Sequence, residues 1–501
     1  IATTGTLRFS KCVFSSNTSG ARGGAVRGES VVLSFIESNF TSNQSALNGG
    51  AISADNSTVF TTRCIFTSNQ SNSNGGGACH ISKGAWEDNN SSYANNISSF
   101  GGGAFLWEEA TGSLADSNFT SNENTSWNGG GAIYVSKSSP IISRCIFNAN
   151  ITKANSPGGA INLNNASPII SNCTFSSNLA SNFAGGALGI NETSLPSASN
   201  NFFHNNTAPF AGAIYASGTT GLTFSNSIFI GNKATTSSST GGGVIALQGG
   251  SATNFISCVF SGNSAVNYAG VLMSAGDTRF VNCSLAGNSA DYGGVTILLP
   301  GDSVSFENSI LWGNVGTTSG SDVFVNSQTA TASHSLFDPS KSNGTLSGSG
   351  NLSMNPLFVD ADGPDNLTGT EDDDLTLHSS SPAINHASSS VSGYSTTDLL
   401  GKTRSGAPDL GAYEFIPNSA PSITQGTNAT LSLNEDGAIS TSYSVTDVDG
   451  DSLSWSVLTE AVHGEVTVEA NTGALTYSSN EDYFGEDSFT LQVSDGMNIA
   501  Q

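Results

Sequence analysis

The acidic residues that follow residue 350 have the types and the spacing of a calcium site. Asp360, Asp362 and Asp365 form an Asp-x-Asp-Gly-x-Asp pattern, which places oxygen ligands around the turn at Gly363. Carboxylate oxygens around a glycine turn are donors that Ca²⁺ prefers in protein loops. The pattern lacks a full EF-hand loop, so a solvated acidic loop is the alternative. We expect calcium as the cofactor, with these three carboxylates among its ligands.

A second set of ionisable residues, near residue 110, bears on catalysis. Glu108, Glu109, Asp116 and Glu123 occur within one short region, and Lys83 precedes them. Glycosidases use two carboxylates at a fixed separation, and polysaccharide lyases need a basic side chain beside the proton that is removed. These residues recur in no motif, and the six histidines are scattered along the chain. We therefore expect no enzymatic activity, with a secreted polysaccharide lyase or glycosidase as the alternative.

The net charge of −25 is concentrated in the last third of the chain. Residues 1–350 carry 16 acidic and 12 basic side chains, whereas residues 351–501 carry 23 acidic ones and only Lys402 and Arg404 as basic ones. Nucleic-acid binding needs a basic face, so we expect no nucleic-acid partner. No apolar run reaches the length of a membrane span, and no basic and apolar leader opens the chain. We expect these residues to belong to a longer protein.

Residues 1 to about 340 repeat two short patterns with a period of 25 to 31 residues. The first pattern is an aromatic residue or Leu followed three residues later by Asn, with copies at Phe14/Asn17, Phe40/Asn43, Phe66/Asn69, Phe119/Asn122, Phe147/Asn150, Phe175/Asn178, Phe203/Asn206, Phe229/Asn232, Phe260/Asn263, Leu285/Asn288 and Leu311/Asn314. Between Phe66 and Phe119, we expect Trp86 and Asn89 to be a degenerate copy of this pattern. The second pattern is a small pair followed by an apolar residue, as in Gly49-Gly50-Ala51-Ile52.

A repeat of this length, with short β-prone runs and no helical spacing, predicts an all-β right-handed parallel β-helix of about 11 to 12 coils. Each coil would contain three short strands and three turns, and would pair with the next coil roughly 4.8 Å away. The aromatic residues would stack inside. The Asn would lie at a turn, where it tolerates unusual backbone angles and can bond to its copy in the next coil. The Gly-Gly-Ala segment would let coils approach closely.

These paired patterns resemble the repeats of the chlamydial polymorphic outer-membrane proteins and of related bacterial β-helix passengers. The resemblance covers about 330 residues and rests on the Gly-Gly-Ala-Ile/Val/Leu and Phe-x-x-Asn motifs quoted above. Because members of that family are surface adhesins, it implies an adhesive role. A solenoid can carry many activities, so the resemblance bears more directly on fold than on function.

Six of the seven cysteines lie two residues before the aromatic or Leu of the first pattern. Alternation along a strand makes that position inward-facing. Disulfides are permitted outside the cell, but directly stacked neighbours meet the required geometry poorly, so we expect buried free thiols. No pair has the spacing of a zinc site. The six are Cys12, Cys64, Cys145, Cys173, Cys258 and Cys283, and Ser takes the place at Ser38, Ser117, Ser227 and Ser309.

The coil pattern fades after residue 350. Residues 351–416 run from Asn355-Pro356-Leu357-Phe358 to Gly411-Ala412-Tyr413-Glu414, and they resemble the closing segment that follows many bacterial secreted β-helices. Such a segment would plug the open end of the solenoid, whose last coil otherwise exposes apolar rings and an unpaired edge. We therefore predict a β-helix over 1–350, an acidic closing segment over 351–416 and a separate module over 417–501.

The last module alternates apolar and polar residues over several short runs, which predicts an Ig-like β-sandwich. Its acidic landmarks, such as Asp447-Val448-Asp449-Gly450-Asp451, are similar to those of the cadherin-like modules in giant bacterial adhesins. In such modules calcium lies at the domain ends and stiffens the junction. Asp436 and Asp487 are weaker candidates. By position, the resemblance implies calcium ligands at Glu435, Asp447, Asp449, Asp451 and Asp495.

Together these features predict a non-catalytic extracellular or cell-surface adhesin or structural stalk, stiffened by calcium and able to assemble end to end. Its expected partners are a cell-surface or glycan receptor, or neighbouring copies or domains of the same protein. A carbohydrate-binding face is a further alternative, because exposed aromatic side chains on one face would bind sugars. The aromatic residues concerned are Trp86, Tyr93, Trp107, Trp127 and Tyr134, each of which could instead belong to the core.

Overall fold

The computed structural model describes residues 5–153, 155–218, 221–237, 241–249, 252–274, 276–298, 301–318, 322–324, 329–404, 406–448 and 450–501. The chain forms two compact units, Ile1–Glu414 and Phe415–Gln501. Within the described ranges the regular structure is β-strand apart from one short 3-10 helix, η1 (Pro339–Lys341). No helix in those ranges is long and apolar enough to cross a membrane. The all-β prediction is confirmed.

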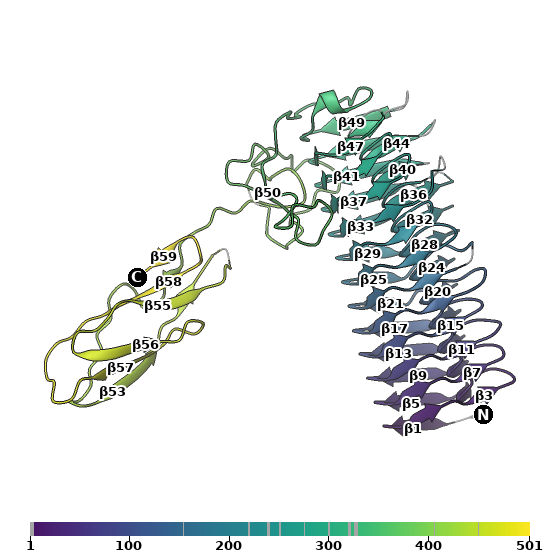
Figure 1. The fold of residues 1–501 in the computed structure, drawn as a ribbon, viewed down its shortest axis with the longest axis horizontal. Coiled ribbons are helices and arrows are strands. Elements are labelled where there is room, and N and C mark those ends of the chain that lie inside the picture. Colours follow the sequence, from purple (N-terminus) through teal and green to yellow (C-terminus); the bar gives the residue numbers. More distant parts are fainter. Residues whose placement is uncertain are drawn as a thin grey trace. The chain divides into compact units, whose positions relative to one another are not determined.

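The first unit is a solenoid whose coils stack along one axis (Figure 1). Its strands form four parallel sheets. Sheet 1 contains β1 (Thr6–Ser10), β5 (Val32–Ile36), β9 (Thr58–Thr62), β13 (Ala85–Asn89), β17 (Thr111–Ala115), β21 (Ile141–Ser143), β25 (Ile169–Ser171), β29 (Ser197–Ser199), β33 (Leu222–Ser225), β37 (Thr253–Ile256), β41 (Asp277–Val281), β45 (Ser303–Glu307) and β49 (Thr329–Ser333). Sheet 2 contains β2 (Val13–Ser15), β6 (Asn39–Thr41), β10 (Ile65–Thr67), β14 (Ser92–Ala94), β18 (Asn118–Thr120), β22 (Ile146–Asn148), β26 (Thr174–Ser176), β30 (Phe202–His204), β34 (Ile228–Ile230), β38 (Val259–Ser261), β42 (Ser284–Ala286) and β46 (Ile310–Trp312).

Sheets 3 and 4 complete each coil. Sheet 3 contains β3 (Thr18–Ser19), β7 (Gln44–Ser45), β11 (Gln70–Ser71), β15 (Ile97–Ser98), β19 (Glu123–Asn124), β23 (Ile151–Thr152), β27 (Leu179–Ala180), β31 (Thr207–Ala208), β35 (Lys233–Ala234), β39 (Ser264–Ala265), β43 (Ser289–Ala290) and β47 (Val315–Gly316). Sheet 4 contains β4 (Val26–Glu29), β8 (Ile52–Asp55), β12 (Cys79–Ser82), β16 (Phe105–Glu108), β20 (Ile133–Ser136), β24 (Ile161–Asn164), β28 (Leu188–Asn191), β32 (Ile214–Ser217), β36 (Ile245–Gln248), β40 (Leu272–Ser274), β44 (Thr296–Leu298) and β48 (Val323–Phe324).

Twelve strands in three of these sheets confirm the predicted number of coils, but the expectation of three strands per coil is wrong. The difference arises at the Asn turn. In the first coil, Ser16 adopts a left-handed backbone with φ 54° and Asn17 follows it, after which the chain resumes pairing at once in the two-residue strand β3. The turn at Ser16 and Asn17 therefore separates a strand of sheet 2 from a strand of sheet 3, which gives each coil a fourth strand. It is the residue before the Asn, not the Asn itself, that takes the unusual backbone angle.

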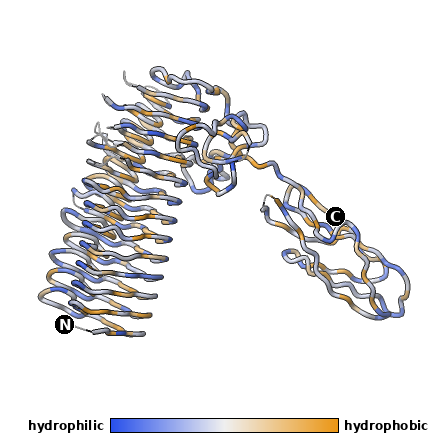
Figure 2. The backbone as a smooth tube through the Cα atoms, turned by 180° about the vertical axis from the view of Figure 1, so that it is seen from behind, coloured by the Kyte–Doolittle hydropathy of each residue, from blue (hydrophilic) through white to orange (hydrophobic). Residues whose placement is uncertain are grey.

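The interior is a continuous stack of aromatic rings, as predicted. Hydrophobic and hydrophilic segments alternate along the coils (Figure 2). Phe147, Phe175 and Phe203 are fully buried, with ring centroids 4.9 and 4.7 Å apart and nearly parallel planes. The ring between Phe66 and Phe119 is Tyr93, which stacks on both. The assignment of Trp86 and Asn89 as the degenerate copy is therefore wrong.

An uninterrupted column of asparagines fastens each coil to the next. Asn150 is representative: its Nδ2 donates to Asn178 Oδ1 (3.0 Å) and Phe119 O (2.9 Å), while its Oδ1 accepts from the backbone N–H (3.0 Å) and Nδ2 (2.9 Å) of Asn122. Tyr93 is followed three residues later by Asn96, which hydrogen-bonds to Asn69 and Asn122 on the two neighbouring coils. Asn96 is thus the member of the column that the predicted copies of the pattern did not include. The members are Asn17, Asn43, Asn69, Asn96, Asn122, Asn150, Asn178, Asn206, Asn232, Asn263, Asn288 and Asn314.

Asp322 lies in the same coil as Asn314, the last Asn of the column, and its burial predicts a pH dependence of the stability of the solenoid. Asn314 Nδ2 donates to Asp322 Oδ1 (3.1 Å), and burial raises the pKa of this carboxyl from 3.8 to about 7. The folded protein therefore binds the proton more tightly than the unfolded chain, and stability falls as the pH rises from about 4 to about 7. We expect Asp322→Asn to raise the melting temperature at pH 8 by about 2–4 °C and to leave it nearly unchanged at pH 4. Scanning calorimetry at both pH values measures this.

Asp291→Asn is the control for this prediction, because Asp291 is exposed in the same part of the solenoid. It should shift the melting temperature little at either pH. An equal shift for both variants, or a shift of Asp322→Asn that does not depend on pH, would show that the buried carboxyl is not responsible.

The Gly-Gly-Ala segments permit the close approach of coils that their composition predicts. Gly158 has φ 83°, and a side chain at Gly159 would collide with the carbonyl oxygen of Gly186 in the next coil. Instead, Gly159 N–H donates to Gly185 O (2.9 Å). An L-residue at either place would be strained or would separate the coils.

The plug that the sequence suggests for residues 351–416 differs from the arrangement in the structure, where mainly the residues before this segment cover the end of the solenoid. The coil path continues through single parallel bridges at Leu336, Asn343, Ser347 and Leu352, so this stretch lies over the last apolar layer. The acidic part that follows contains the antiparallel pair β50 (Phe358–Asp360) and β51 (Asp374–Leu377) and lies beside the last coils (Figure 1). There it packs against the outer side of sheet 2.

Apolar contacts and backbone hydrogen bonds hold this acidic segment in place. Leu375 and Ala412 pack on Val259 and Ala286 of sheet 2. Ala412 N–H donates to Ser284 Oγ (3.0 Å). Outward-facing apolar residues of sheet 2 thus explain why the segment covers a side of the solenoid.

The second unit is an Ig-like β-sandwich of antiparallel strands, as predicted. Trp455, Val466, Leu475, Tyr477 and Val493 are buried in it. Its strands are β52 (Ser422–Ile423), β53 (Ala438–Ser442), β54 (Val445–Thr446), β55 (Ser454–Thr459), β56 (Gly464–Val468), β57 (Ala474–Ser479), β58 (Thr490–Ser494) and β59 (Ile499–Ala500), paired as β52-β54, β53-β57-β56 and β55-β58-β59.

Candidate functional site

The first predicted calcium ligands lie in the acidic segment after β50. Asp360 ends β50, and Asp362 and Asp365 lie in the turns that follow. Asp365 Oδ1 already accepts from the Leu367 N–H (2.8 Å), so it stabilises its own turn. Among the residues that the structure describes, no three His, Cys, Asp or Glu side chains converge as metal ligands. These carboxylates therefore do not form a preorganised site, and calcium binding stays a prediction.

The predicted ligands of the second unit also stabilise turns. Asp447 Oδ1 accepts from the Gly450 N–H (2.9 Å) and the Asp451 N–H (3.4 Å). Asp495 Oδ1 accepts from the Met497 N–H (2.7 Å), and backbone N–H groups hold the pKa of the Asp495 carboxyl below its usual value. Glu435 is exposed, and Asp449 lies outside the described residues.

The carboxylates near residue 110 form ion pairs with cations and not the carboxylate pair of a glycosidase. Glu109 Oε1 lies 3.4 Å from Lys137 Nζ, and its Oε2 lies 4.0 Å from Lys83 Nζ. Asp116 pairs with Arg144 (2.7 Å) and Glu123 pairs with Lys153 (2.7 Å). Each partner lies on a neighbouring coil, so these residues form exposed ladders of alternating charge. Such exposed pairs contribute little to stability.

The register brings Glu108, which the sequence analysis singles out, together with Ser53 and His80, which it does not. Ser53 Oγ lies 3.1 Å from His80 Nδ1, and His80 Nε2 lies 3.7 Å from Glu108 Oε2. Ser, His and Glu are also the components of a hydrolytic triad. Ser53 and His80 are 0% and 1% exposed, however, so Ser53 Oγ is not accessible to a substrate. The hydrogen bond with His80 lowers the pKa of Glu108, which suits a structural ion pair.

An aromatic sugar-binding face is not present where the sequence suggested it. Trp86, Tyr93 and Trp107 are fully buried in the core, and Tyr134 is 8% exposed. Trp127 is the exception, with 63% of its surface exposed. Four of these five residues therefore belong to the core, which the sequence analysis gave as the other possibility for each of them.

All seven cysteines are free thiols, which includes the six in the repeat position for which the sequence predicts them. Five of the six in the repeat position are buried and Cys12 is partly exposed. Cys145 Sγ lies within hydrogen-bonding distance of the carbonyl oxygens of Ser143 (3.4 Å) and Leu114 (3.6 Å). Burial raises the pKa of the Cys64 and Cys79 thiols, so these groups have little nucleophilic character.

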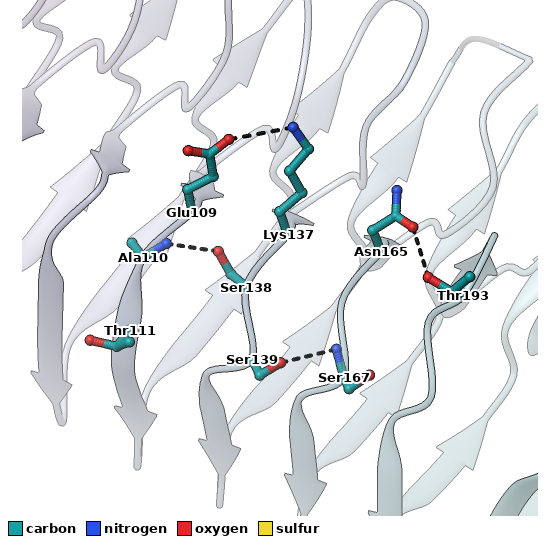
Figure 3. Close-up of a pocket in the computed structure, with 9 residues that line it drawn as sticks. All are labelled: Glu109, Ala110, Thr111, Lys137, Ser138, Ser139, Asn165, Ser167 and Thr193. Atoms are coloured by element: carbon teal, nitrogen blue, oxygen red, sulfur yellow. Dashed lines mark hydrogen bonds and ion pairs between the residues drawn. The ribbon is translucent and has the colours of Figure 1, made fainter.

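A shallow groove of about 460 Å³ crosses successive coils where sheet 4 turns into sheet 1 (Figure 3). Asn165 Oδ1 accepts from Thr193 Oγ1 (2.8 Å), and Ser138 Oγ accepts from the Ala110 N–H (2.9 Å). Two rows of side chains line it: Glu109, Lys137, Asn165 and Thr193 at the corner, and Thr111, Ser139 and Ser167 at the start of sheet 1.

Proline shapes this groove. Pro140 and Pro168 are buried and follow Ser139 and Ser167 directly. Because proline has no N–H, it cannot donate to the preceding coil. β21 and β25 accordingly begin only after the prolines. The serine hydroxyls serve as acceptors in this gap: the Ser167 N–H donates to Ser139 Oγ (3.3 Å), and the Leu195 N–H donates to Ser167 Oγ (3.2 Å).

Three family models match parts of the chain. The model of the right handed beta helix region matches residues 116–253, that of the Chlamydia polymorphic membrane protein repeat matches residues 37–55, and that of the bacterial Ig domain matches residues 418–500. A search of curated proteins finds no significant match. The first two matches confirm the β-helix and the repeat resemblance, and the third confirms the Ig-like domain.

Proposed function

We propose that this chain is the non-catalytic rod of an extracellular adhesin, displayed at a cell surface. A β-helix, a polymorphic membrane protein repeat and an Ig domain fit a surface adhesin-like protein. One observation carries the proposal. The matched residues 37–55 contain Phe40 and Asn43, and the ring stacking and hydrogen bonds of these two residues recur along the solenoid.

Partners of such a rod would be a cell-surface or glycan receptor, or neighbouring copies of the same protein. A solenoid presents a long lateral surface to which each coil contributes the same backbone positions. Neighbouring copies would assemble end to end along the solenoid axis. Sedimentation velocity over a concentration series tests this, and a monomer at every concentration would contradict it.

The adhesive role is tested with coated beads. Beads that carry the folded chain should attach to cultured cells several times more often than beads that carry the heat-denatured chain. The same preparation is incubated with polygalacturonate and xylan. Equal attachment of both bead types would contradict adhesion, and release of reducing ends or unsaturated uronate would favour the alternative of a polysaccharide-active enzyme.

Calcium stiffening is the remaining part of the proposal. Residues 415–501 carry 13 carboxylates and neither Lys nor Arg, so their mutual repulsion is a direct reason for a divalent cation to bind. We expect millimolar Ca²⁺ to raise the melting temperature of this unit by about 5 °C, because a ligand of the folded form stabilises it. Calorimetry of the full chain measures this against NaCl at equal ionic strength.

Asp447→Asn combined with Asp451→Asn should remove most of the calcium-dependent shift. Glu460→Gln is the matched control, because Glu460 is an exposed carboxylate of the same unit outside the predicted ligand set. If Ca²⁺ raises the melting temperature no more than NaCl does, the acidic turns are only solvated surface.

A further inference from the structure

We propose that the groove lined by Glu109, Lys137, Asn165 and Thr193 binds a neutral oligosaccharide that lies along the solenoid axis. This extends the proposed function, on which it rests for the extracellular setting, by naming the chemical class of one ligand.

The hydroxyl groups of Ser139 and Ser167 are preorganised donors. Each oxygen accepts a backbone N–H from the following coil, at 3.3 and 3.2 Å, which fixes its position. A hydroxyl that accepts in this way retains its own hydrogen for donation. Both side chains are exposed, and they precede the adjacent strands β21 and β25 on coils roughly 4.8 Å apart. That spacing is close to the length of one pyranose unit, so successive sugar rings would meet successive coils.

The charge of the groove favours a neutral ligand. Lys137 Nζ lies 3.4 Å from Glu109 Oε1, so the two charged groups of the corner row offset each other. The other two members of that row are the neutral Asn165 amide and Thr193 hydroxyl: Thr193 Oγ1 donates to Asn165 Oδ1, and Asn165 Nδ2 donates to the carboxylate of Glu192, which adds a negative charge beside the row. The groove has no surplus of positive charge that would attract the carboxylates of a polyuronate. The hydroxyl groups of a neutral sugar are better partners for its polar side chains.

Apolar side chains border the polar row, as a sugar ring requires. Ile141 and Ile169 are each 46% exposed and lie two residues beyond Ser139 and Ser167, on the same outward face of sheet 1. One side of a pyranose ring presents hydroxyl groups at its edge and C–H groups on its face. The serines and the isoleucines would contact these two kinds of surface respectively, which is the usual combination of apolar area and a few oriented polar groups in a ligand site.

Calorimetric titration of the full chain with tetrasaccharides tests the proposal. The neutral probes are cellotetraose, chitotetraose and mannotetraose, and tetragalacturonate is the charged probe. At least one neutral probe should bind saturably and more tightly than tetragalacturonate. Ser139→Ala with Ser167→Ala should weaken binding about ten-fold, because two hydrogen bonds are lost. Ile141→Ser with Ile169→Ser should also weaken it, and this variant leaves the serine–backbone bonds intact.

Ser34→Ala is the matched control, since Ser34 faces outward from sheet 1 on a distant coil and should leave binding unchanged. The melting temperature of every variant is recorded. Absence of binding by all three neutral probes, or equal binding by wild type and both groove variants, would overturn the proposal. Bead attachment without oligosaccharide binding would overturn only this inference and leave the adhesive function standing.

Discussion

Phe175→Ala is expected to lower the free energy of unfolding of the solenoid by about 3–5 kcal/mol. Phe175 is fully buried, and its ring stacks between Phe147 and Phe203 in parallel planes. Truncation removes the buried ring and leaves a cavity. The adjacent coils are held at fixed spacing by backbone hydrogen bonds, so they cannot move together to fill it. Urea denaturation followed by tryptophan fluorescence measures the loss.

Phe60→Ala is the control for this substitution. Phe60 lies on the outer side of β9 and is 42% exposed, so its removal leaves no cavity. We expect a loss below about 1 kcal/mol. If both variants lost the same stability, the aromatic stack would not be the core of the fold.

Asn150→Leu should destabilise the solenoid by about 2–4 kcal/mol, although Leu is close to Asn in size. The substitution removes the acceptor of the Asn122 N–H and the donor to Phe119 O, both of which are buried. A buried polar group without a partner carries its full desolvation penalty. Faster hydrogen exchange of the Asn122 amide would locate the effect, and urea denaturation would give its size.

Asn118→Leu provides the comparison, because Asn118 is exposed on the outer side of β18, close to the same coils. It should change stability by less than about 0.5 kcal/mol. Unchanged exchange at Asn122 in the Asn150→Leu variant would contradict the role assigned to the asparagine column.

The sequence predicts most of the solenoid because its two patterns mark positions that are physically irreplaceable. Phe175 and Asn178 each contact a residue of the same kind one coil away, so the period is visible in the chain. Tyr93 and Asn96 also satisfy the pattern of an aromatic residue followed three residues later by Asn, so this copy could have been predicted from the sequence. The fourth sheet was not predicted because two-residue strands such as β3 are too short to show an alternation of apolar and polar residues.

The candidate sites were less predictable, because they depend on which residues become neighbours across coils. Ser53, His80 and Glu108 lie on three successive coils, and only the register shows that they meet and that two of them are buried. The Ser-Pro pairs that shape the groove, Ser139-Pro140 and Ser167-Pro168, recur one coil apart, which is a signal that could have been found. The acidic turns are visible in the sequence, but whether they bind a cation is not.

The uniform hydrogen bonding of the asparagine column has a consequence for how such a molecule changes its length. Because every rung uses the same donors and acceptors, the junction between any two coils is chemically equivalent to the next. Duplication or loss of one whole coil in the gene would leave all remaining rungs satisfied. Evolution could therefore adjust the reach of the molecule in steps of roughly 4.8 Å without redesigning its interior.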